Sequence, residues 1–263
     1  MLRLLPIPAR PAQSDEPEWM DAPGHPRSLI DDNLDDLRRV NWLLGGRRLT
    51  LSSFARLAER VPRAERLVVL DVATGAADIP RAIARWGARV ERPVLVVATD
   101  FHEAVLVSGR DHEPAPPSVV FCVADATALP FRDGAFHVAA SSLALHHLSP
   151  PQAERAFREQ RRCTTIGVVV NDVVRSWFAL GGAYLATRLG STNRLTHHDG
   201  PLSVRRAFTV PEIRRLACAA GLKPLEWRSF LFYRVALIAV PDPGIPEELN
   251  RSAPSSSAGR NGR

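Results

Sequence analysis

Short apolar runs alternate with longer amphipathic stretches through most of the chain. Between residues 66 and 172 the runs RLVVLDV, VLVVAT, VVFCV, FHVAASS and IGVVVND are almost continuously apolar. Strands of a parallel sheet are buried on both faces and show this pattern. The sequence therefore predicts strands at 66–72, 94–99, 119–123, 136–142 and 166–172.

Helical periodicity lies before and between these runs. In NLDDLRRVNWLLGG the apolar residues recur every three or four positions, which predicts a helix capped by Asn33 and ended by Gly45 and Gly46. Further helices are expected at about 50–61 and 176–190.

Two capping boxes mark the starts of two later helices. Ser149 precedes Gln152 by three residues, and Thr209 stands in the same relation to Glu212. The last two apolar runs, KPLEWRS and FLFYRVALIAV, are separated by too little chain for a crossover and predict an antiparallel hairpin. The whole pattern predicts an α/β fold, a doubly wound and mostly parallel sheet of seven strands with an N-terminal helical cover.

The ends of the chain differ from this pattern. Residues 1–27 contain six prolines, and residues 241–263 have few apolar side chains. Both segments are expected to be disordered and to stay out of the functional site. The helical cover is then placed at 28–61 and the main domain at 62–240.

The charge of the chain carries little information about a partner. The 263 residues have a formal net charge of +6, and Lys223 is the single lysine among 34 lysine and arginine residues. The arginines are interleaved with apolar residues and glutamates, as in ARLAERVPRAER, which is typical of a solvated helix face. No nucleic-acid partner is expected.

Three scattered cysteines, Cys122, Cys163 and Cys218, form no CxxC pair, so we expect buried thiols in a reducing compartment and no metal site. No run approaches the roughly 20 apolar residues of a membrane helix. The expectation is a cytoplasmic protein without a membrane partner, and both a monomer and a homodimer remain open.

Acidic residues follow the first three predicted strands. Asp71 opens DVATGAAD, Asp100 ends the second strand, and Asp125 with Ala126 lies just past the third. Ligands of open α/β sheets bind at this edge. The glycine turn and helix start after Asp71 suit an anionic group, Asp100 suits the two hydroxyls of a ribose, and Asp125 with the next N–H suits the edge of adenine. Each acid alone is more typical of a cap or turn, but their order favours a nucleoside-containing cofactor.

These motifs resemble the class I S-adenosylmethionine-dependent methyltransferases over about residues 30–240. DVATGAAD is similar to the first motif of that family, ATDFHEAVL to its acidic second-strand end, and VADATALPFRDGAFHVAASSLALHHL to its adenine-binding and fourth-strand motifs. The last stretch, with ADATALPF and a doubled histidine, is similar to the small-molecule subgroup related to ubiquinone and menaquinone C-methyltransferases. The resemblance implies S-adenosylmethionine as the cofactor.

The resemblance also implies roles for residues. Asp71 and Gly75 would shape the turn under the methionine moiety, Asp100 would hold the ribose, and Phe101 would lie against the adenine. The implied cofactor site comprises Asp71, Ala73, Thr74, Gly75, Asp78, Asp100, Phe101, Asp125, Ala126, Ser141 and Ser142.

Two positions depart from the family, which usually has glycine where this chain has Ala73 and Ala77. The methyl group of Ala77 is expected to crowd the cofactor, and a domain that has lost the cofactor is the alternative. A dinucleotide site would need G-x-G-x-x-G after the first strand, whereas Gly87 is the next glycine after Gly75.

The acceptor is less visible in the sequence. The fourth strand ends in SSLA rather than the NPPY-like motif of amino-directed nucleic-acid methyltransferases, which favours a small-molecule acceptor. A base is needed only if the acceptor loses a proton, and histidine suits that role near neutral pH. Catalytic candidates are His146, His147, His197 and His198, and substrate-binding candidates are Asn171, Asp172 and Arg175. For each of these residues the alternative is a structural role, in which its side chain packs against a neighbouring element or ends a strand.

The polar segment 191–208 lacks a clear apolar period and is expected to be a lid that orders when ligands bind. The sequence thus predicts a methyltransferase of secondary metabolism that acts on an oxygen or carbon of a small, aromatic or polyketide-like metabolite. Two alternatives stay open: a repurposed fold acting as a non-methylating cyclase, decarboxylase or binding protein, and a methyltransferase of RNA or protein.

Overall fold

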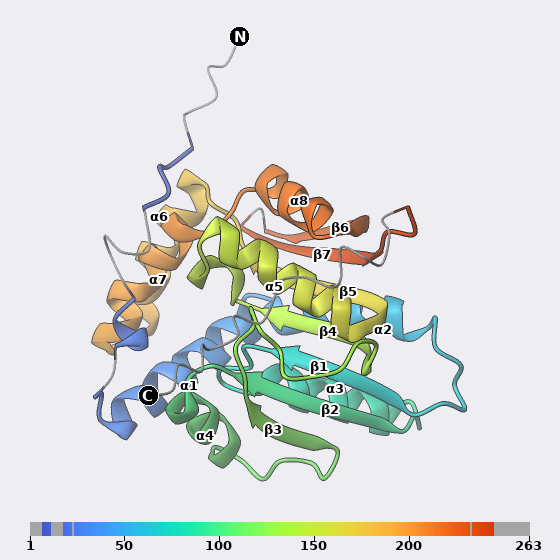
Figure 1. The fold of residues 1–263 in the computed structure, drawn as a ribbon. Helices are drawn as coiled ribbons and strands as arrows, with labels where there is room; N and C mark the ends of the chain where they lie inside the picture. The colour runs from blue at the N-terminus through green and yellow to red at the C-terminus, as the bar shows by residue number, and fades with distance from the viewer. Residues whose placement is uncertain (1–6, 12–17, 23, 232, 245–263) are drawn as a thin grey trace, which may run out of the picture.

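The computed structural model describes residues 7–11, 18–22, 24–231 and 233–244 (Figure 1). Its centre is a seven-stranded sheet in the order β3-β2-β1-β4-β5-β7-β6. The strands are β1 (Leu67–Val72), β2 (Val94–Asp100), β3 (Val119–Val123), β4 (Phe136–Ser142), β5 (Thr164–Val173), β6 (Leu222–Phe230) and β7 (Arg234–Pro241). Neighbours from β3 to β5 are parallel, and β7 runs antiparallel to both β5 and β6. The predicted fold class is confirmed.

Helices cover both faces of the sheet. They are α1 (Arg27–Leu43), α2 (Gly46–Ala58), α3 (Asp78–Arg89), α4 (Glu103–Asp111), α5 (Pro150–Cys163), α6 (Trp177–Gly190), α7 (Arg194–Arg206) and α8 (Val210–Ala219), with the short 3-10 helices η1 (Trp19–Asp21) and η2 (Leu145–His147). Both predicted capping boxes are present, at the starts of α5 and α8. No helix among the described residues is long and apolar enough to cross a membrane.

Alternating side chains of the strands divide the core in two. Val168 of β5 packs in the cluster that holds Phe157 of α5 and Ile213 of α8. Its neighbour Val169 packs in the cluster that holds Phe54 of α2 and residues of α3 on the opposite face. Successive strand residues point to opposite faces, so both faces of the central strands need apolar side chains. This requirement explains the continuous apolar runs in the sequence.

The first helix begins earlier than predicted. Arg27 starts α1 directly after Pro26, and Asn33 is an interior residue rather than the cap. The extension is stabilised because Ile30 and Leu34 form one apolar cluster with Val105 of α4. The consequence for the site is that Asn33 faces inward from the middle of a helix.

The expectation that segment 191–208 has no packing of its own is wrong, while its role as a lid that responds to ligands stays a prediction. Most of this segment is helix α7, and the side chain of Asn193 caps it by accepting a hydrogen bond from the N–H of Leu195 at 2.8 Å. Leu195 and Leu202 are buried. Two apolar positions seven residues apart lie on one helix face, and that face provides enough packing although the segment is mainly polar.

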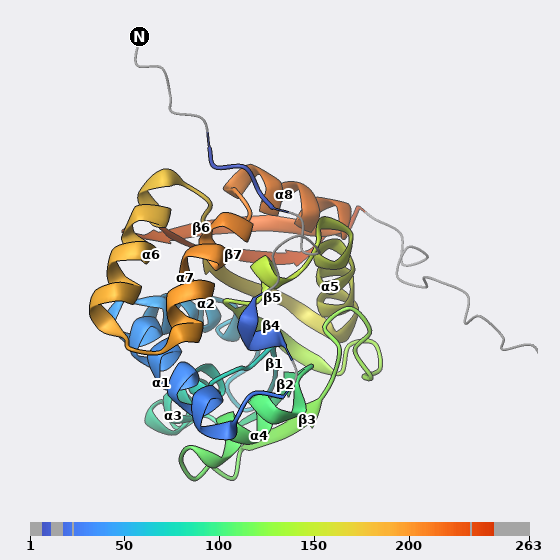
Figure 2. The ribbon, with the colours of Figure 1, turned by 90° about the vertical axis from the view of Figure 1, so that its left-hand side faces the viewer.

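Figure 2 looks onto the carboxyl ends of the central strands, with α1, α6 and α7 standing around them. The described residues near the N-terminus cross the same end. Residues 1–6, 12–17, 23 and 245–263 lie outside the described part of the chain, so the disorder expected at both ends stays a prediction, as do the domain boundaries.

Candidate functional site

A cavity of about 630 Å³ lies at the carboxyl ends of the central strands. Twelve predicted site residues line it: Asp71, Ala73, Thr74, Gly75, Asp78, Asp100, Phe101, Asp125, Ala126, Ser142, His146 and His147. Ser141, Asn171, Asp172, Arg175, His197 and His198 do not. The sequence pattern of strand-end residues therefore brings most of the predicted site together.

Asp100 connects the second strand to the loop after the first. Its Oδ2 accepts a hydrogen bond from the N–H of Gly75 at 2.9 Å, and its Oδ1 accepts one from the N–H of His102 at 3.1 Å. Burial raises the pKa of this carboxyl group, and the two backbone N–H groups oppose that rise. A carboxylate oxygen has two lone pairs, so each oxygen keeps one for a ligand hydroxyl.

Asp71 is a strongly perturbed acid at this edge. Burial, with a contribution from the nearby carboxyl groups of Asp78 and Asp100, raises its pKa to about 8. Its Oδ2 is buried and has no hydrogen-bond partner among the described residues. Burial also raises the pKa of Asp78, which accepts a hydrogen bond from Nδ2 of Asn41 at 2.6 Å. Three carboxyl groups in one cluster, of which Asp71 and Asp100 are buried and Asp78 half-buried, favour a cationic ligand, since a cation would stabilise their charged forms.

Asp125 lies past the third strand and forms a local turn. Its Oδ1 accepts hydrogen bonds from the N–H of Thr127 at 2.7 Å and from the Thr127 hydroxyl at 2.8 Å. The turn-forming role of this acid and its position in the cavity are thus compatible, because Oδ2 is not used by the turn. Phe101 also lines the cavity although its side chain is 63% exposed, so its ring lies at the opening.

The loop after β1 has a positive φ at three alternate positions. Ala73, Gly75 and Ala77 have φ values of 56°, 47° and 55°. The two alanines therefore occupy a left-handed conformation that favours glycine. Ala77 is fully buried and does not line the cavity. The expectation that its methyl group crowds the cofactor is wrong, because the departure from glycine acts on the backbone instead.

His146 is held by Asp172 at the end of β5. The N–H of His146 donates to Oδ2 of Asp172 at 3.0 Å, and the ring Nδ1 lies 2.6 Å from Oδ1. Burial would raise the pKa of Asp172, but the interactions with His146 outweigh it and lower the pKa. An ionised acceptor at Nδ1 fixes a proton on that atom, so Nε2 is the nitrogen left for a ligand. Asp172 thus positions the imidazole and does not itself reach the cavity.

His147 binds the N-terminal segment. Its Nδ1 lies 3.3 Å from Oδ2 of Asp21 and 3.5 Å from Oε2 of Glu18. Burial alone would lower the pKa of His147, but the two carboxylates outweigh it and raise the pKa to about 10. Glu18, Met20 and Asp21 line the cavity. The expectation that residues before 28 stay out of the site is therefore wrong for these residues.

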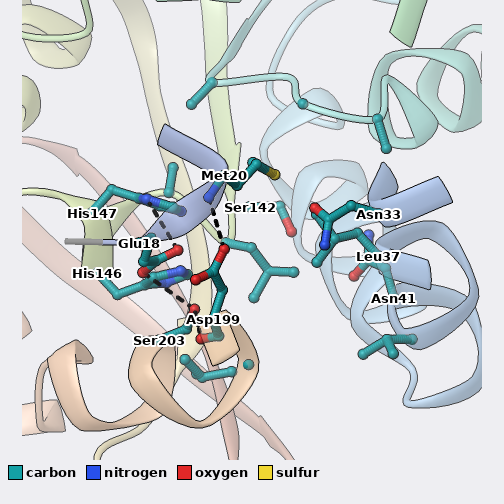
Figure 3. A pocket seen from close by; sticks show the side chains of 18 of the residues that line it. Glu18, Met20, Asn33, Leu37, Asn41, Ser142, His146, His147, Asp199 and Ser203 are labelled. Atoms are coloured by element: carbon teal, nitrogen blue, oxygen red, sulfur yellow. Dashed lines mark hydrogen bonds and ion pairs between the residues drawn. The ribbon is translucent and has the colours of Figure 1, made fainter. Parts of the chain in front are cut away.

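Asp199 of α7 fixes the same segment from the other side. Its two carboxylate oxygens accept hydrogen bonds from the N–H groups of Trp19 and Met20, at 2.8 and 2.9 Å. The indole of Trp19 stacks on the ring of His198, with centroids 4.0 Å apart. Figure 3 shows Glu18, His146, His147 and Asp199 on one side of the pocket and Asn33, Leu37 and Asn41 of α1 on the other.

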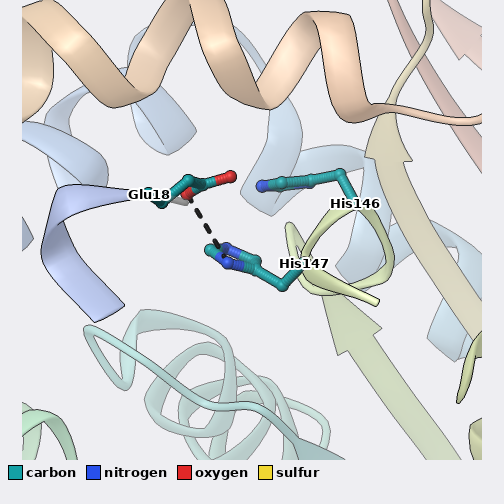
Figure 4. Close-up of side chains that lie close together, drawn as sticks. All are labelled: Glu18, His146 and His147. Carbon is teal, nitrogen blue, oxygen red and sulfur yellow. Dashed lines mark ion pairs between the residues drawn. The ribbon is translucent and has the colours of Figure 1, made fainter. Parts of the chain in front are cut away.

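Glu18, His146 and His147 also form a group with the composition of a metal site. Their ligand atoms all lie within 4.8 Å of one another, and the three side chains point toward one another (Figure 4). A metal-bound imidazole must be neutral, so an ion here would have to displace the proton that the carboxylates of Glu18 and Asp21 stabilise on His147 by raising its pKa to about 10. Arg206 adds a second positive charge, with Nη1 3.5 Å from Oε1 of Glu18. Ion pairing therefore accounts for this cluster.

The remaining predicted catalytic and cofactor residues have structural contacts. His197 donates from Nε2 to the carbonyl oxygen of Ser191 at 2.8 Å, and Nδ1 of His198 lies 2.7 Å from Oδ1 of Asp199. Ser141 is buried within the sheet between β1 and β5.

The two substrate-binding candidates on and after β5 face away from the cavity. Asn171 donates from Nδ2 to the carbonyl oxygen of Gly46 at 2.9 Å and to the Thr50 hydroxyl at 2.7 Å, which joins β5 to α2. Arg175 forms two bonds of 2.7 Å to the carboxylate of Glu212. Both residues stabilise the scaffold behind the site.

Sequence reasoning missed the apolar side of the cavity. This side is formed by residues in or next to α1, α6, α7 and β7. They are Leu37, Val40, Leu44, Phe178, Ala179, Gly182, Ala183, Ala186, Val204 and Tyr233. The apolar period of α1 predicts a helix with a buried face, but the pattern does not say that a cavity lies against that face. Within α6, apolar residues lie on every side, so no face stands out.

Comparisons with known proteins match this architecture. Residues 69–167 match the family model described as a methyltransferase domain. The chain is similar to a demethylmenaquinone methyltransferase of Clavibacter sepedonicus, 34% identical over 131 residues that cover 49% of this chain and 50% of that protein. A demethylmenaquinone methyltransferase of Beutenbergia cavernae is 34% identical over 150 residues, covering 54% of this chain and 55% of that protein. The chain therefore spans about half the length of the curated relatives it matches.

Solved structures show the same fold. Human N-acetylserotonin methyltransferase in complex with S-adenosylmethionine gives a TM-score of 0.60 at 14% identity, covering 82% of this chain and 57% of that one. Magnesium protoporphyrin IX methyltransferase of Synechocystis PCC 6803, with bound S-adenosylhomocysteine, gives a TM-score of 0.56 at 14% identity, covering 82% of this chain and 98% of that one. Together the comparisons confirm the resemblance and the fold class inferred from the sequence.

Proposed function

We propose that this chain, a relative of the class I S-adenosylmethionine-dependent methyltransferases, moves a methyl group from S-adenosylmethionine to a small, apolar acceptor. The acceptor atom is an oxygen or carbon of an aromatic or polyketide-like metabolite. One observation carries the proposal: a single cavity joins the acidic strand ends to an apolar chamber that contains His146. A cationic methyl donor and an apolar acceptor would meet there.

The residues present fit the cofactor. S-adenosylmethionine supplies, when bound, a methyl group on a sulfonium cation. The unpartnered buried Oδ2 of Asp71 and the neighbouring Asp78 and Asp100 form a site for positive charge. Asp100 would hold the ribose hydroxyls. Asp125 and Ala126 would bind the adenine edge, and Phe101 at the opening would lie against its face.

The acceptor side favours a flat, apolar molecule. The cavity is lined by Leu37 and Val40 of α1, by Leu44 directly after it, and by Ala179 and Ala183 of α6. Apolar walls exclude water, and alignment of the acceptor with the methyl group provides most of the acceleration in a displacement of this kind.

His146 is the group we assign to the acceptor proton. Its Nε2 is available because Nδ1 is bound by Asp172. A phenol or an activated ring carbon that receives the methyl group would release a proton to this nitrogen. Asp172 is the positioning residue, since it holds the imidazole in the tautomer that leaves Nε2 basic.

The test is a pair of measurements on the full chain. Calorimetric titration with S-adenosylhomocysteine measures the cofactor site, and formation of S-adenosylhomocysteine from S-adenosylmethionine across a panel of phenols and hydroquinones measures transfer. We expect micromolar-range binding and acceptor-dependent turnover. Binding without turnover on the panel would support a non-methylating binder, and no binding would overturn the proposal.

A further inference from the structure

Helix α6 exposes an unusual apolar face. Phe178, Leu185 and Leu189 are 70%, 62% and 80% exposed. Their spacing of seven and four residues places them on one side of the helix. Among its fourteen residues, Arg188 is the single charged one. The outward side of this helix is therefore apolar where solvent contact would favour polar side chains.

The inward side of α6 is apolar as well. Ala179 and Leu180 are buried against Val204 of α7, and the end of the helix is fixed where Arg39 donates to the carbonyl oxygen of Gly190 at 3.3 Å. A helix that is apolar on all sides is typically covered by another protein surface or by lipid. The described residues cover only one side, so the outer side remains available to a partner.

The exposed face borders the mouth of the cavity. Phe178, Gly182 and Ala186 are exposed and also line the cavity, so the cavity reaches the surface along α6. Trp42 and Leu43 at the end of α1 are 61% and 60% exposed and lie between Asn41 and Leu44, which line the cavity. Exposed apolar side chains of α1 and of α6 thus stand next to cavity-lining residues in the chain.

The charge next to this surface is positive. Helix α6 contains no acidic residue, and the exposed side chains of Arg188 and Arg194 lie near its end. Helices that lie in a bilayer interface combine an apolar face with arginine or lysine at its border, together with tryptophan. Trp42 and Trp177, which is 51% exposed, provide that last feature.

We propose that the docking surface, defined as Trp42, Leu43, Phe178, Leu185 and Leu189, binds the surface of an anionic lipid bilayer. The contact is interfacial, since α6 has fourteen residues and is too short to span a membrane. A second copy of the chain on this surface would cover Phe178 at the cavity opening. Lipid instead provides a fluid apolar phase from which an apolar acceptor reaches the cavity. The supply of acceptor from the lipid rests on the proposed function, whereas the docking to lipid does not.

The test is co-sedimentation of the full chain with vesicles of phosphatidylcholine alone and of phosphatidylcholine with phosphatidylglycerol. We expect binding to the anionic vesicles that weakens with added salt. The double variant Leu185→Asp with Leu189→Asp should bind about tenfold or more weakly, because two apolar side chains no longer enter the interface. The matched control is Val120→Asp with Val123→Asp, which alters two valines that are 49% and 50% exposed on edge strand β3.

Equal binding of both double variants, or no binding of the native chain to anionic vesicles, would overturn the proposal. So would a native dimer in light scattering that the α6 variant separates into monomers, since a second copy would then cover the surface. Circular dichroism checks that both variants fold. Calorimetry with S-adenosylhomocysteine measures the cofactor site separately from lipid binding. A variant that loses lipid binding but keeps normal cofactor affinity therefore tests this proposal without testing the proposed function.

Discussion

Gly109 of α4 lies directly against the carbonyl oxygen of Gly75 in the loop after β1. A Cβ atom at position 109 would lie 2.3 Å from that oxygen, which is far closer than nonbonded atoms approach. The close approach explains why α4 can support the loop whose N–H group binds Asp100. A glycine within a helix is usually unfavourable, so this one is retained for packing.

The substitution Gly109→Ala should therefore displace the Gly75 loop. We expect affinity for S-adenosylhomocysteine to fall by about tenfold, because the loop shapes the proposed methionine site and a shift of backbone cannot be absorbed by a flexible side chain. Calorimetry measures the affinity. Gly181→Ala is the matched control, since a Cβ atom there has no neighbour within 4 Å. Unchanged affinity in the α4 variant would show that the loop does not contact the cofactor.

Asp100→Ala should weaken binding of both S-adenosylmethionine and S-adenosylhomocysteine. Loss of charge-assisted hydrogen bonds to a diol costs about 1.5 to 3 kcal/mol, which corresponds to a rise in Kd of roughly 10- to 150-fold. Calorimetry on both ligands tests this. Asp32→Ala, which removes an exposed carboxylate from α1, serves as the control. Equal affinities of the two variants would contradict the assignment of Asp100 to the ribose.

The strand ends were predictable because a buried parallel strand leaves a strong local signal. A run such as VLVVAT predicts the strand, and the polar residue at its end then lies at the edge of the sheet where the carboxyl ends of the strands meet. The cofactor half of the site, including Asp71, Asp100 and Asp125, follows from that rule and from the resemblance. The parallel pairing of β1, β2 and β3 brings the ends of these strands to one edge of the sheet.

The acceptor half was not predictable by the same means. Glu18 reaches the cavity through an ion pair with His147, more than a hundred residues away in the chain. Asn171 lies near the end of β5 as Asp100 lies at the end of β2, yet its amide turns toward Gly46 and Thr50. Local pattern places a residue at an edge, but the side of the strand and the long-range partner decide which way the side chain points.

Asp172→Asn should reduce turnover and leave the cofactor site intact. An amide at this position no longer offers two acceptor oxygens to the N–H and ring of His146, so the imidazole loses its fixed tautomer. We expect kcat to fall by about 100-fold or more while the Kd for S-adenosylhomocysteine stays within twofold. His146→Gln should give the same pattern. If turnover stays native in both variants, no base is needed and the acceptor reacts without losing a proton to this residue.

Ala77→Gly should stabilise the fold. Ala77 caps α3 with a φ of 55°, and a left-handed alanine costs about 1 to 2 kcal/mol. Part of this gain is lost because glycine is more flexible in the unfolded chain, which leaves about 0.5 to 1 kcal/mol. Urea unfolding measures the change. Cofactor affinity should not change, since Ala77 does not line the cavity. Tighter cofactor binding without a gain in stability would restore the idea that the methyl group crowds the ligand.

The ion pairs of His147 should make attachment of the N-terminal segment dependent on pH. In the folded protein the carboxylates of Glu18 and Asp21, which outweigh burial, raise its pKa to about 10, and in an unfolded chain histidine titrates near pH 6.5. A pKa raised by folding stabilises the folded state fully below about pH 6.5, and this contribution is lost as the pH rises through 10. The pKa of Asp21 is lowered, because the interactions with His147 outweigh burial, so its contribution is lost instead as the pH falls toward the acid range.

We therefore expect the free energy of unfolding of the native chain to fall between pH 6 and pH 9.5 by more than that of the variant His147→Gln. The amides of Trp19 and Met20, which donate to Asp199, should also exchange with solvent faster at the higher pH than the intrinsic rate alone explains. His102→Gln is the control, since His102 lies 3.8 Å from Asp21 without the contact to Glu18. An identical pH dependence in the native chain and the His147 variant would contradict the ion pair as the group that holds this segment over the cavity.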